Sequence, residues 1–296
     1  MTNPTVLITG STSGIGKATA TGLAERGATV LMVARDTARG QAAKADIERR
    51  VPDARLSLYT ADLGDLDAVR ALADRIDGEH DRLDVLINNA AVAWFPGAQH
   101  GSSENVPGQD QQRRQDAGVQ RGELMFRTNH LAPFLLTTRL LPLLTRSAPA
   151  RVITVGSSSH RQVRAIPWND LPAATTYPLS KTCNILFGYE LARRTEGTGV
   201  TSNCADPGFV RTNLGRHLTG GIGMLIKLTR PVQTSPDKGA ATSVYLATAP
   251  EVAETSGRCF AKCRPVRTSP LTHDPDVARR LWEISTEAVL TPGQPG

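Results

Sequence analysis

Short apolar runs of strand length alternate with amphipathic stretches of helical spacing along almost the whole chain. The expected strands are 5–9, 29–33, 56–59, 85–87, 152–155, 200–204 and 258–261, and the expected helices are 16–26, 40–51, 68–76, 124–144 and 178–194. Neighbouring parallel strands need a crossover connection, which is usually a helix. The alternation therefore predicts an α/β fold, with a doubly wound parallel sheet covered by helices on both faces, in a single domain over residues 1–296.

Two segments interrupt the alternation. Residues 97–122 are polar and rich in Gly and Gln, so we predict a surface insertion there. Residues 213–235 mix glycines with large apolar residues. This second segment is expected to be a substrate loop or lid, with a helix packed on its own core as the alternative.

Composition excludes several classes of protein. The 296 residues carry a net charge of +6, four Cys and 4% aromatic residues. The few Cys do not form a disulfide framework, and Cys259 and Cys263 lack the spacing of a zinc site, so no metal is expected. Scattered Arg and few aromatics argue against nucleic-acid binding. Neither a signal peptide nor an apolar span of about 20 residues is evident, so we expect a cytoplasmic protein with no integral membrane segment.

A glycine-rich turn separates the first expected strand from the first expected helix. Gly10 permits the tight turn, Gly14 lets the backbone approach a pyrophosphate, and Gly16 lets the helix pack closely on the strand. The free N–H groups at the helix N-terminus then face the anion. This placement predicts a dinucleotide site in a Rossmann-type fold.

The end of the second strand indicates which dinucleotide is bound. NAD sites place a carboxylate there for the adenosine ribose, whereas this chain has Ala34 followed by Arg35, with Lys17 expected nearby. Two cations without a carboxylate favour the 2′-phosphate of NADP. Asp36 comes next, and it either points into this site or caps the following helix. We therefore predict NADP(H) as the cofactor.

Tyr177 and Lys181 have the spacing that places two side chains on one face of a helix. An ammonium beside a phenol favours the phenolate, which should lower the pKa of Tyr177 toward the working range. Pro178 suits the first helical turn and places Tyr177 at the start of the helix. The pair predicts proton transfer at a carbinol oxygen, with a plain surface pair as the alternative.

These features together resemble the short-chain dehydrogenase/reductase family, whose motifs follow one another in order over nearly the whole chain. The matching motifs are Thr9–Gly16, Asp62-Leu63, Asn88–Ala91, Asn129 within Thr128–His130, Ser157, Tyr177–Lys181 and Pro207–Thr212. The chain departs from the family pattern at two positions. Ala91 replaces the usual last Gly of its motif, and Asp206 replaces the usual His before Pro-Gly.

The resemblance implies roles for the site residues. Tyr177 would transfer the proton, and Lys181 would lower its pKa and hold the nicotinamide ribose. Ser157 would bind the substrate oxygen, with Ser158 as the alternative, and Asn129 would join Lys181 to a water chain. The implied cofactor-binding residues are Gly10, Ser11, Thr12, Ser13, Gly14, Ile15, Gly16, Lys17, Arg35, Asp62, Leu63, Asn89, Ala90, Ala91, Tyr177, Lys181, Pro207, Gly208, Val210 and Thr212.

Within the family, residues 33–36, 129–137, 180–187, 256–263 and 278–282 resemble the retinol dehydrogenase-like branch. This branch implies an NADP-dependent oxidoreductase that interconverts a lipophilic ketone or aldehyde and its alcohol. The alternatives are a ketoreductase that tailors a polycyclic secondary metabolite, and a non-catalytic nucleotide-binding protein of the same fold. The apolar helices 124–144 and 178–194, which pair across a two-fold axis in the family, predict a homodimer or homotetramer. The alternative is a monomer in which the 97–122 segment covers these helices.

Overall fold

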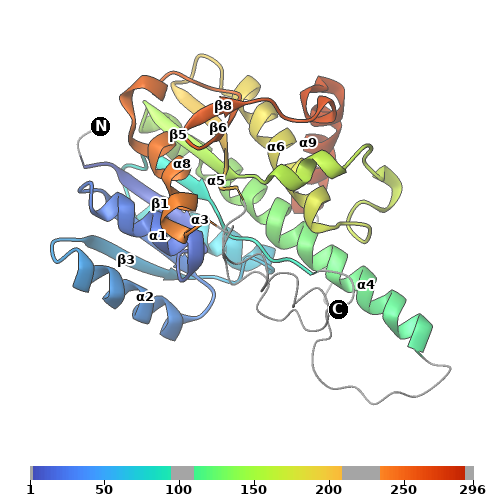
Figure 1. Ribbon diagram of the computed structural model, residues 1–296, viewed down its shortest axis with the longest axis horizontal. Helices are drawn as coiled ribbons and strands as arrows, with labels where there is room; N and C mark the ends of the chain where they lie inside the picture. The colour runs from blue at the N-terminus through green and yellow to red at the C-terminus, as the bar shows by residue number, and fades with distance from the viewer. Residues whose placement is uncertain (1–2, 95–109, 209–233, 291–296) are drawn as a thin grey trace.

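An eight-stranded sheet forms the centre of the computed structural model, which describes residues 3–94, 110–208 and 234–290 (Figure 1). The strands are β1 (Thr5–Thr9), β2 (Thr29–Ala34), β3 (Arg55–Thr60), β4 (Val85–Asn88), β5 (Ala150–Val155), β6 (Val200–Asp206), β7 (Arg258–Ala261) and β8 (Arg264–Val266). They lie in the order β3-β2-β1-β4-β5-β6-β7-β8. All neighbouring strands are parallel except β7 and β8, which pair antiparallel. The predicted α/β class and doubly wound sheet are therefore confirmed.

Helices cover both faces of the sheet. One face packs on α1 (Gly14–Ala24), α2 (Thr37–Arg50) and α8 (Pro236–Thr248), and the other on α3 (Leu66–Glu79), α5 (Ala132–Arg146) and α6 (Tyr177–Arg194), with α9 (Pro275–Leu290) outside α5 and α6. Alternate residues of β1 show the division, because Val6 and Ile8 face the first layer while Leu7 faces the second. The central strands are therefore apolar on both sides, as buried parallel strands require. Among the described helices, none combines the length and apolar composition needed to cross a membrane.

The strand order determines where a ligand site can form. The chain winds outward from β1 through β2 to β3 and then returns to place β4 on the other side of β1. Parallel strands bring their carboxyl ends to one edge, and ligands of such folds bind outside that edge, where the winding reverses. The residues that follow β1, β4, β5 and β6 therefore meet at a single edge of the sheet.

The C-terminal part of the sheet differs from the sequence prediction. All seven expected strands are present, but β8 and the helices α8 and α9 were not predicted. The chain reaches β8 through Lys262 and Cys263, whose φ angles are 50° and 58°. The expectation of a purely parallel sheet is wrong at this edge, because a three-residue strand containing Pro265 is too short to show the alternation on which the prediction depended.

The second half of the predicted surface insertion is helical. α4 (Asp110–Phe126) begins there and extends away from the body of the molecule in Figure 1. Gln and Arg have good helix propensity, so a polar run of these residues is compatible with a helix. Residues 97–109 lie outside the described residues. So does the predicted lid at 213–235, apart from its last two residues.

The long helix expected over residues 124–144 is interrupted by a π-helical turn, Arg127–Leu131, between α4 and α5. The N–H of Ala132 bonds to the carbonyl of Arg127, five residues earlier rather than four. Pro133 has no N–H and cannot donate to the carbonyl of Asn129, so the regular ladder is already broken at this point. Such turns are frequent at functional sites.

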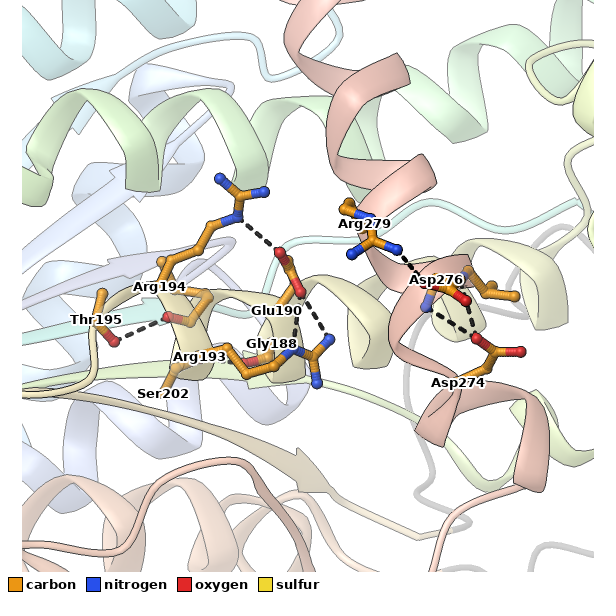
Figure 2. A network of polar contacts seen from close by, with 11 residues as sticks. Gly188, Glu190, Arg193, Arg194, Thr195, Ser202, Asp274, Asp276 and Arg279 are labelled. Atoms are coloured by element: carbon orange, nitrogen blue, oxygen red, sulfur yellow. Dashed lines mark hydrogen bonds and ion pairs between the residues drawn. The ribbon is translucent and has the colours of Figure 1, made fainter.

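The C-terminal helix α9 packs against α5 and α6. The indole ring of Trp282 on α9 lies with its centroid 4.8 Å from that of Phe134 and 5.9 Å from that of Phe187. The guanidinium of Arg194 lies 4.4 Å above the same indole, and its Nε donates to Glu190 at 2.8 Å (Figure 2). Apolar surface of α5 and α6 is thus covered within the chain by α9.

Candidate active site

The glycine-rich turn after β1 adopts backbone geometry that other residues would strain. Gly10 has a φ of +68° and Gly14 has a φ of +54°. A Cβ atom on Gly16 would lie 2.1 Å from the carbonyl oxygen of Gly10, and a Cβ atom on Gly10 would lie 2.8 Å from the Cα of Ala90. The loop is therefore closed against both the start of α1 and the end of β4.

Side-chain hydrogen bonds tie this loop to the neighbouring strands. The hydroxyl oxygen of Thr9 accepts the N–H groups of Asn89 and Ala90 at 3.0 and 3.1 Å. The side-chain amide of Asn89 donates to the carbonyls of Thr9 and Gly10 at 2.8 and 3.2 Å. Ser11, which is fully buried, donates its hydroxyl to Val33 at 3.2 Å. Thr9 was absent from the predicted site residues, although it directly precedes the glycine turn.

The start of α1 fits an anionic group. Ser13 is the N-cap residue, but its side chain makes no capping hydrogen bond to the helix. The N–H groups of the first turn are therefore available to an external acceptor, at the positive end of the helix dipole. Thr12 and Ile15 are half-buried beside this turn, and Ser13 is exposed. These residues and the surrounding glycines form the cradle that a pyrophosphate requires.

The two cations expected at the end of β2 have different surroundings in the structure. Arg35 is exposed and directly follows buried Ala34. The ammonium of Lys17 instead pairs with Asp46 on α2 at 2.5 Å. Asp36 caps α2, because its carboxylate accepts the N–H of Arg39 at 2.7 Å.

A carboxylate that already caps a helix is a poor partner for a ribose. This arrangement therefore favours the alternative in which Asp36 caps the following helix. Arg39, exposed in the first turn of α2, is a second cation near Arg35 that the sequence reasoning missed. The motif spacing did not extend past Asp36, so only the folded position of α2 reveals it.

The remaining predicted cofactor residues lie around the same edge. Asp62 is exposed after β3, where its carboxylate accepts the N–H of Gly64 at 2.9 Å, and Leu63 is buried. Ala91 is half-buried after β4. Pro207 and Gly208 follow β6. Val210 and Thr212 lie outside the described residues.

Tyr177, Ser157 and Lys181 come together where β5 ends and α6 begins. Tyr177 is the first residue of α6, and its hydroxyl hydrogen-bonds the side chain of Ser157. Lys181 is 1% exposed, with its Nζ 5.6 Å from the centroid of the Tyr177 ring and 2.8 Å from the carbonyl oxygen of Val155. Ser158 is exposed and starts a short 3₁₀ helix. The geometry therefore favours Ser157 over Ser158.

Burial has the largest effect on the pKa values of Tyr177 and Lys181. It raises the pKa of Tyr177 to about 12, which the hydrogen bond from Ser157 opposes and the charge of Asp206 reinforces. Burial lowers the pKa of Lys181 to about 8, against the opposing effect of Asp206. The expected lowering of the Tyr177 pKa is wrong in this structure, because desolvation of the phenolate outweighs the favourable interactions.

Asn129 lies in the π-helical turn and is fully buried. Its carboxamide oxygen accepts the N–H of Val92 at 2.8 Å, and its nitrogen donates to the carbonyl of Val92 at 2.8 Å and to the hydroxyl of Ser180 at 3.0 Å. Asn129 thus joins the segment after β4 to the first turn of α6. Among the hydrogen bonds of the described residues, Asn129 therefore reaches α6 through Ser180, the neighbour of Lys181, and not through the Lys181 ammonium.

Two further titratable groups border the site. Asp206 ends β6 and is 9% exposed, and its carboxylate accepts the N–H of Gly208 at 2.9 Å. The sequence singled it out only as a departure from the family pattern. His160 is 2% exposed and hydrogen-bonds the backbone of Ser157. It belongs to none of the motifs, so only the folded structure connects it with the site.

Comparison with known proteins agrees with this geometry. The family model described as short chain dehydrogenase matches residues 4–221. Human retinol dehydrogenase 14 is 40% identical over an alignment 309 positions long, which covers 96% of this chain and 86% of the relative. Human retinol dehydrogenase 13 is 38% identical, covering 96% of this chain and 84% of the relative.

Solved structures show the same fold. The Pseudomonas aeruginosa RhlG/NADP active-site complex is 28% identical with a TM-score of 0.67, and the match covers 88% of this chain and 95% of that chain. The chain that carries this glycine turn and the cluster of Ser157, Tyr177 and Lys181 matches one family model over most of its length. The protein belongs to the short-chain dehydrogenase family.

Proposed function

We propose that this protein is an NADP-dependent oxidoreductase that interconverts a lipophilic ketone or aldehyde and its alcohol. The observation that carries the proposal is the meeting of Ser157, Tyr177 and buried Lys181 where β5 ends and α6 begins, at the sheet edge where the glycine turn also lies. Two hydroxyl groups that converge beside a dinucleotide cradle can bind one carbonyl oxygen. The relatives named retinol dehydrogenases support a lipophilic substrate.

The residues present fit NADP(H), which would supply or accept the hydride when bound. The turn from Gly10 to Gly16 and the open first turn of α1 would hold the pyrophosphate. Arg35 and Arg39 would hold the 2′-phosphate, because neither carries an ion pair in the described structure and Asp36 is engaged as a cap. The named NADP complex among the similar structures supports this assignment.

The chain's own residues would move the proton. Ser157 orients the substrate oxygen and stabilises the charge that develops on it during reduction. Burial keeps Tyr177 protonated, so its hydroxyl is available to donate a proton to that oxygen. Lys181 lies below the ring and stabilises the phenolate left behind. In the direction of oxidation, Tyr177 would accept the proton.

A substrate screen tests the proposed reaction. NADPH consumption would be followed by absorbance with lipophilic aldehydes, lipophilic ketones and polycyclic ketones, and NADP reduction with the matching alcohols. Turnover of acyclic lipophilic aldehydes or ketones supports the proposal, whereas turnover confined to polycyclic ketones supports the tailoring ketoreductase. Tight NADPH binding without turnover of any of these compounds would identify a non-catalytic nucleotide-binding protein.

Cofactor preference tests the assignment of Arg35. We expect NADPH to bind at least about tenfold more tightly than NADH, since a charged hydrogen bond contributes roughly 1.5–3 kcal/mol. Arg35→Ala should remove most of this preference while leaving NADH binding unchanged. Arg279→Ala, which removes an exposed guanidinium on distant α9, is the matched control. Equal dissociation constants of the wild-type protein for the two cofactors, measured by titration, would refute the assignment.

A further inference from the structure

His160 lies between the active-site serine and the C-terminal part of the chain. It belongs to the short 3₁₀ helix Ser158–Gln162, directly after Ser157, and it is 2% exposed. Its Nδ1 is 2.6 Å from the carbonyl oxygen of Ser157. Its Nε2 is 3.1 Å from the backbone nitrogen of Ser269, which lies more than a hundred residues later in the sequence.

These two contacts determine the state of the imidazole. A carbonyl oxygen can only accept a hydrogen bond, so Nδ1 carries the hydrogen and donates it to Ser157. A backbone N–H can only donate, so Nε2 is unprotonated and accepts from Ser269. Burial also lowers the pKa of His160, with a smaller opposing effect from its hydrogen bond to Ser157. The ring is therefore neutral and held in one tautomer.

The same serine is held from its side chain. The hydroxyl oxygen of Ser157 accepts the N–H of Ser159 at 3.2 Å and lies 3.0 Å from the hydroxyl of Ser159. It also hydrogen-bonds Tyr177. His160 supplies the contact on the opposite side of this residue, at its carbonyl. Rotation of the peptide after Ser157 would break that contact and displace the N–H of Ser159, which holds the Ser157 hydroxyl.

The segment around Ser269, the C-terminal partner of His160, is itself held by hydrogen bonds. Thr268, the residue before Ser269, hydrogen-bonds the hydroxyl of Tyr189 on α6 at 3.0 Å and Nε2 of His273 at 2.9 Å. Ser269 is 8% exposed. The N–H that orients His160 therefore comes from a buried segment fixed to the middle of α6.

We propose that His160 is a positioning residue that fixes the Ser157 hydroxyl for the reaction, and that the Thr268-Ser269 segment acts on the active site through it. His160 touches no reacting atom in this assignment. The inference rests on the proposed function, because the effect is expected in the turnover of a carbonyl substrate.

Two substitutions separate the two contacts of the imidazole. The amide of Asn can occupy the place of Nδ1, so His160→Asn can keep the donor to Ser157 and lose the acceptor for Ser269. The longer Gln side chain reaches the place of Nε2, so His160→Gln can keep the acceptor for Ser269 and lose the donor to Ser157. Tyr189→Phe is the matched control, since it loosens the same C-terminal segment without changing His160.

We expect the two His160 variants to differ in kcat. His160→Gln should lower kcat by roughly five- to tenfold with unchanged NADPH affinity, as expected for one lost hydrogen bond that acts in the transition state. His160→Asn, which loses only the contact with Ser269, should lower kcat by about threefold, and Tyr189→Phe should stay within about twofold of the wild type. The proposal is overturned if folded His160→Gln keeps the wild-type kcat, or if His160→Asn loses as much as His160→Gln.

Two measurements cover the remaining cases. If neither histidine variant folds, Ser269→Pro removes the N–H donor at a residue whose φ is already −65°, which proline adopts without strain. A kcat unchanged by Ser269→Pro would also overturn the proposal, and a loss of about threefold supports it. Nitrogen-15 NMR of His160 needs no turnover: an Nδ1–H tautomer supports the proposal, and an Nε2–H tautomer overturns it. A wild-type protein without turnover but with the Nδ1–H tautomer would contradict the proposed function alone.

Discussion

At the scale of single residues, the burial of the Lys181 ammonium lowers the stability of the folded protein. Its ammonium is almost completely removed from solvent, and the carbonyl of Val155 is its hydrogen-bond acceptor. Burial lowers its pKa from 10.5 to about 8. The folded state therefore disfavours the charge that the proposed reaction needs.

This cost predicts a pH-dependent difference between the wild type and Lys181→Met. Below pH 8 the lysine is charged in both the folded and unfolded states, so the cost is present in full. Between about pH 8 and 10.5 the unfolded chain binds more protons than the folded one, so the wild type gains stability as the pH rises. We expect the variant to be more stable by about 2 kcal/mol at pH 7.

Urea unfolding at a series of pH values measures this difference. The advantage of Lys181→Met should shrink as the pH rises above 8. An advantage that does not change with pH would show that packing, rather than the buried charge, sets the difference.

Tyr177 and Lys181 should also differ in their kinetic effects. Tyr177→Phe removes only the hydroxyl, so NADPH binding should persist while kcat falls by about 10²–10⁴-fold. Lys181→Ala should impair both turnover and NADPH binding, because its ammonium is also assigned to the ribose. Steady-state kinetics and cofactor titration distinguish the two patterns. Near-normal turnover by folded Tyr177→Phe would mean that another group supplies the proton.

At the scale of elements, the end of β1, the start of α1 and the end of β4 form one interlocked unit. Gly16 on α1 contacts the backbone of Gly10, and Asn89 after β4 bonds the carbonyls of Thr9 and Gly10. None of these elements can shift without the others. The cradle for the pyrophosphate is therefore a product of three crossing segments rather than of one flexible loop.

Substitution of a single glycine tests this interlock. Gly16→Ala would place a Cβ atom 2.1 Å from the carbonyl oxygen of Gly10 and 2.4 Å from the side-chain nitrogen of Asn89. We expect a loss of roughly 2–4 kcal/mol in unfolding free energy and a loss of NADPH binding. The control is Gly78→Ala on α3, where a Cβ atom meets nothing within 4 Å and stability should rise by up to about 1 kcal/mol.

Thermal and urea unfolding with cofactor titration measure both variants. Equal stability and equal NADPH affinity of Gly16→Ala and the wild type would contradict the interlock. A destabilised Gly78→Ala would show instead that the helices tolerate alanine poorly in general.

At the scale of the whole molecule, α9 changes the expectation for self-association. The prediction of a homodimer or homotetramer rested on apolar faces of the helices around residues 124–144 and 178–194. In the structure Trp282 of α9 packs against Phe134 and Phe187 on those faces. The oligomeric state remains a prediction, and the part of these faces around Phe134 and Phe187 is covered by the chain itself. Within the part of the chain that the structure describes, the covering element is α9, and residues 97–109 of the segment named in the alternative lie outside it.

The packing of α9 predicts the effect of removing its central ring. Trp282→Ala deletes contacts with two aromatic side chains and with the guanidinium of Arg194, so we expect a loss of about 2–4 kcal/mol in unfolding free energy. Exposed α5 and α6 surface should also promote self-association, seen by light scattering as mass above the 31.7 kDa of one chain. Glu283→Ala, on the exposed side of the same helix, is the control.

An unchanged stability of Trp282→Ala would contradict the role of α9 as the cover of this face. A wild-type mass of twice 31.7 kDa would instead place a dimer interface on another surface, or require α9 to move.

Features that depend on near neighbours in the chain could be predicted from the order of the amino acids. The alternation of apolar runs determined the sheet and its helical layers, the glycine spacing determined the turn after β1, and the spacing of Tyr177 and Lys181 placed both on the first turns of α6. Each of these follows from the local period of a strand or a helix, so a few consecutive residues suffice.

Properties that depend on residues far apart in the chain followed from the folded structure. It paired Lys17 with Asp46, raised the pKa of Tyr177 by burial, and brought the N–H of Ser269 to His160. It also added β8 at the edge of the sheet and laid α9 over α5 and α6. Ion pairs, desolvation and helix docking depend on which distant surfaces meet, and no local pattern in the sequence carries that information.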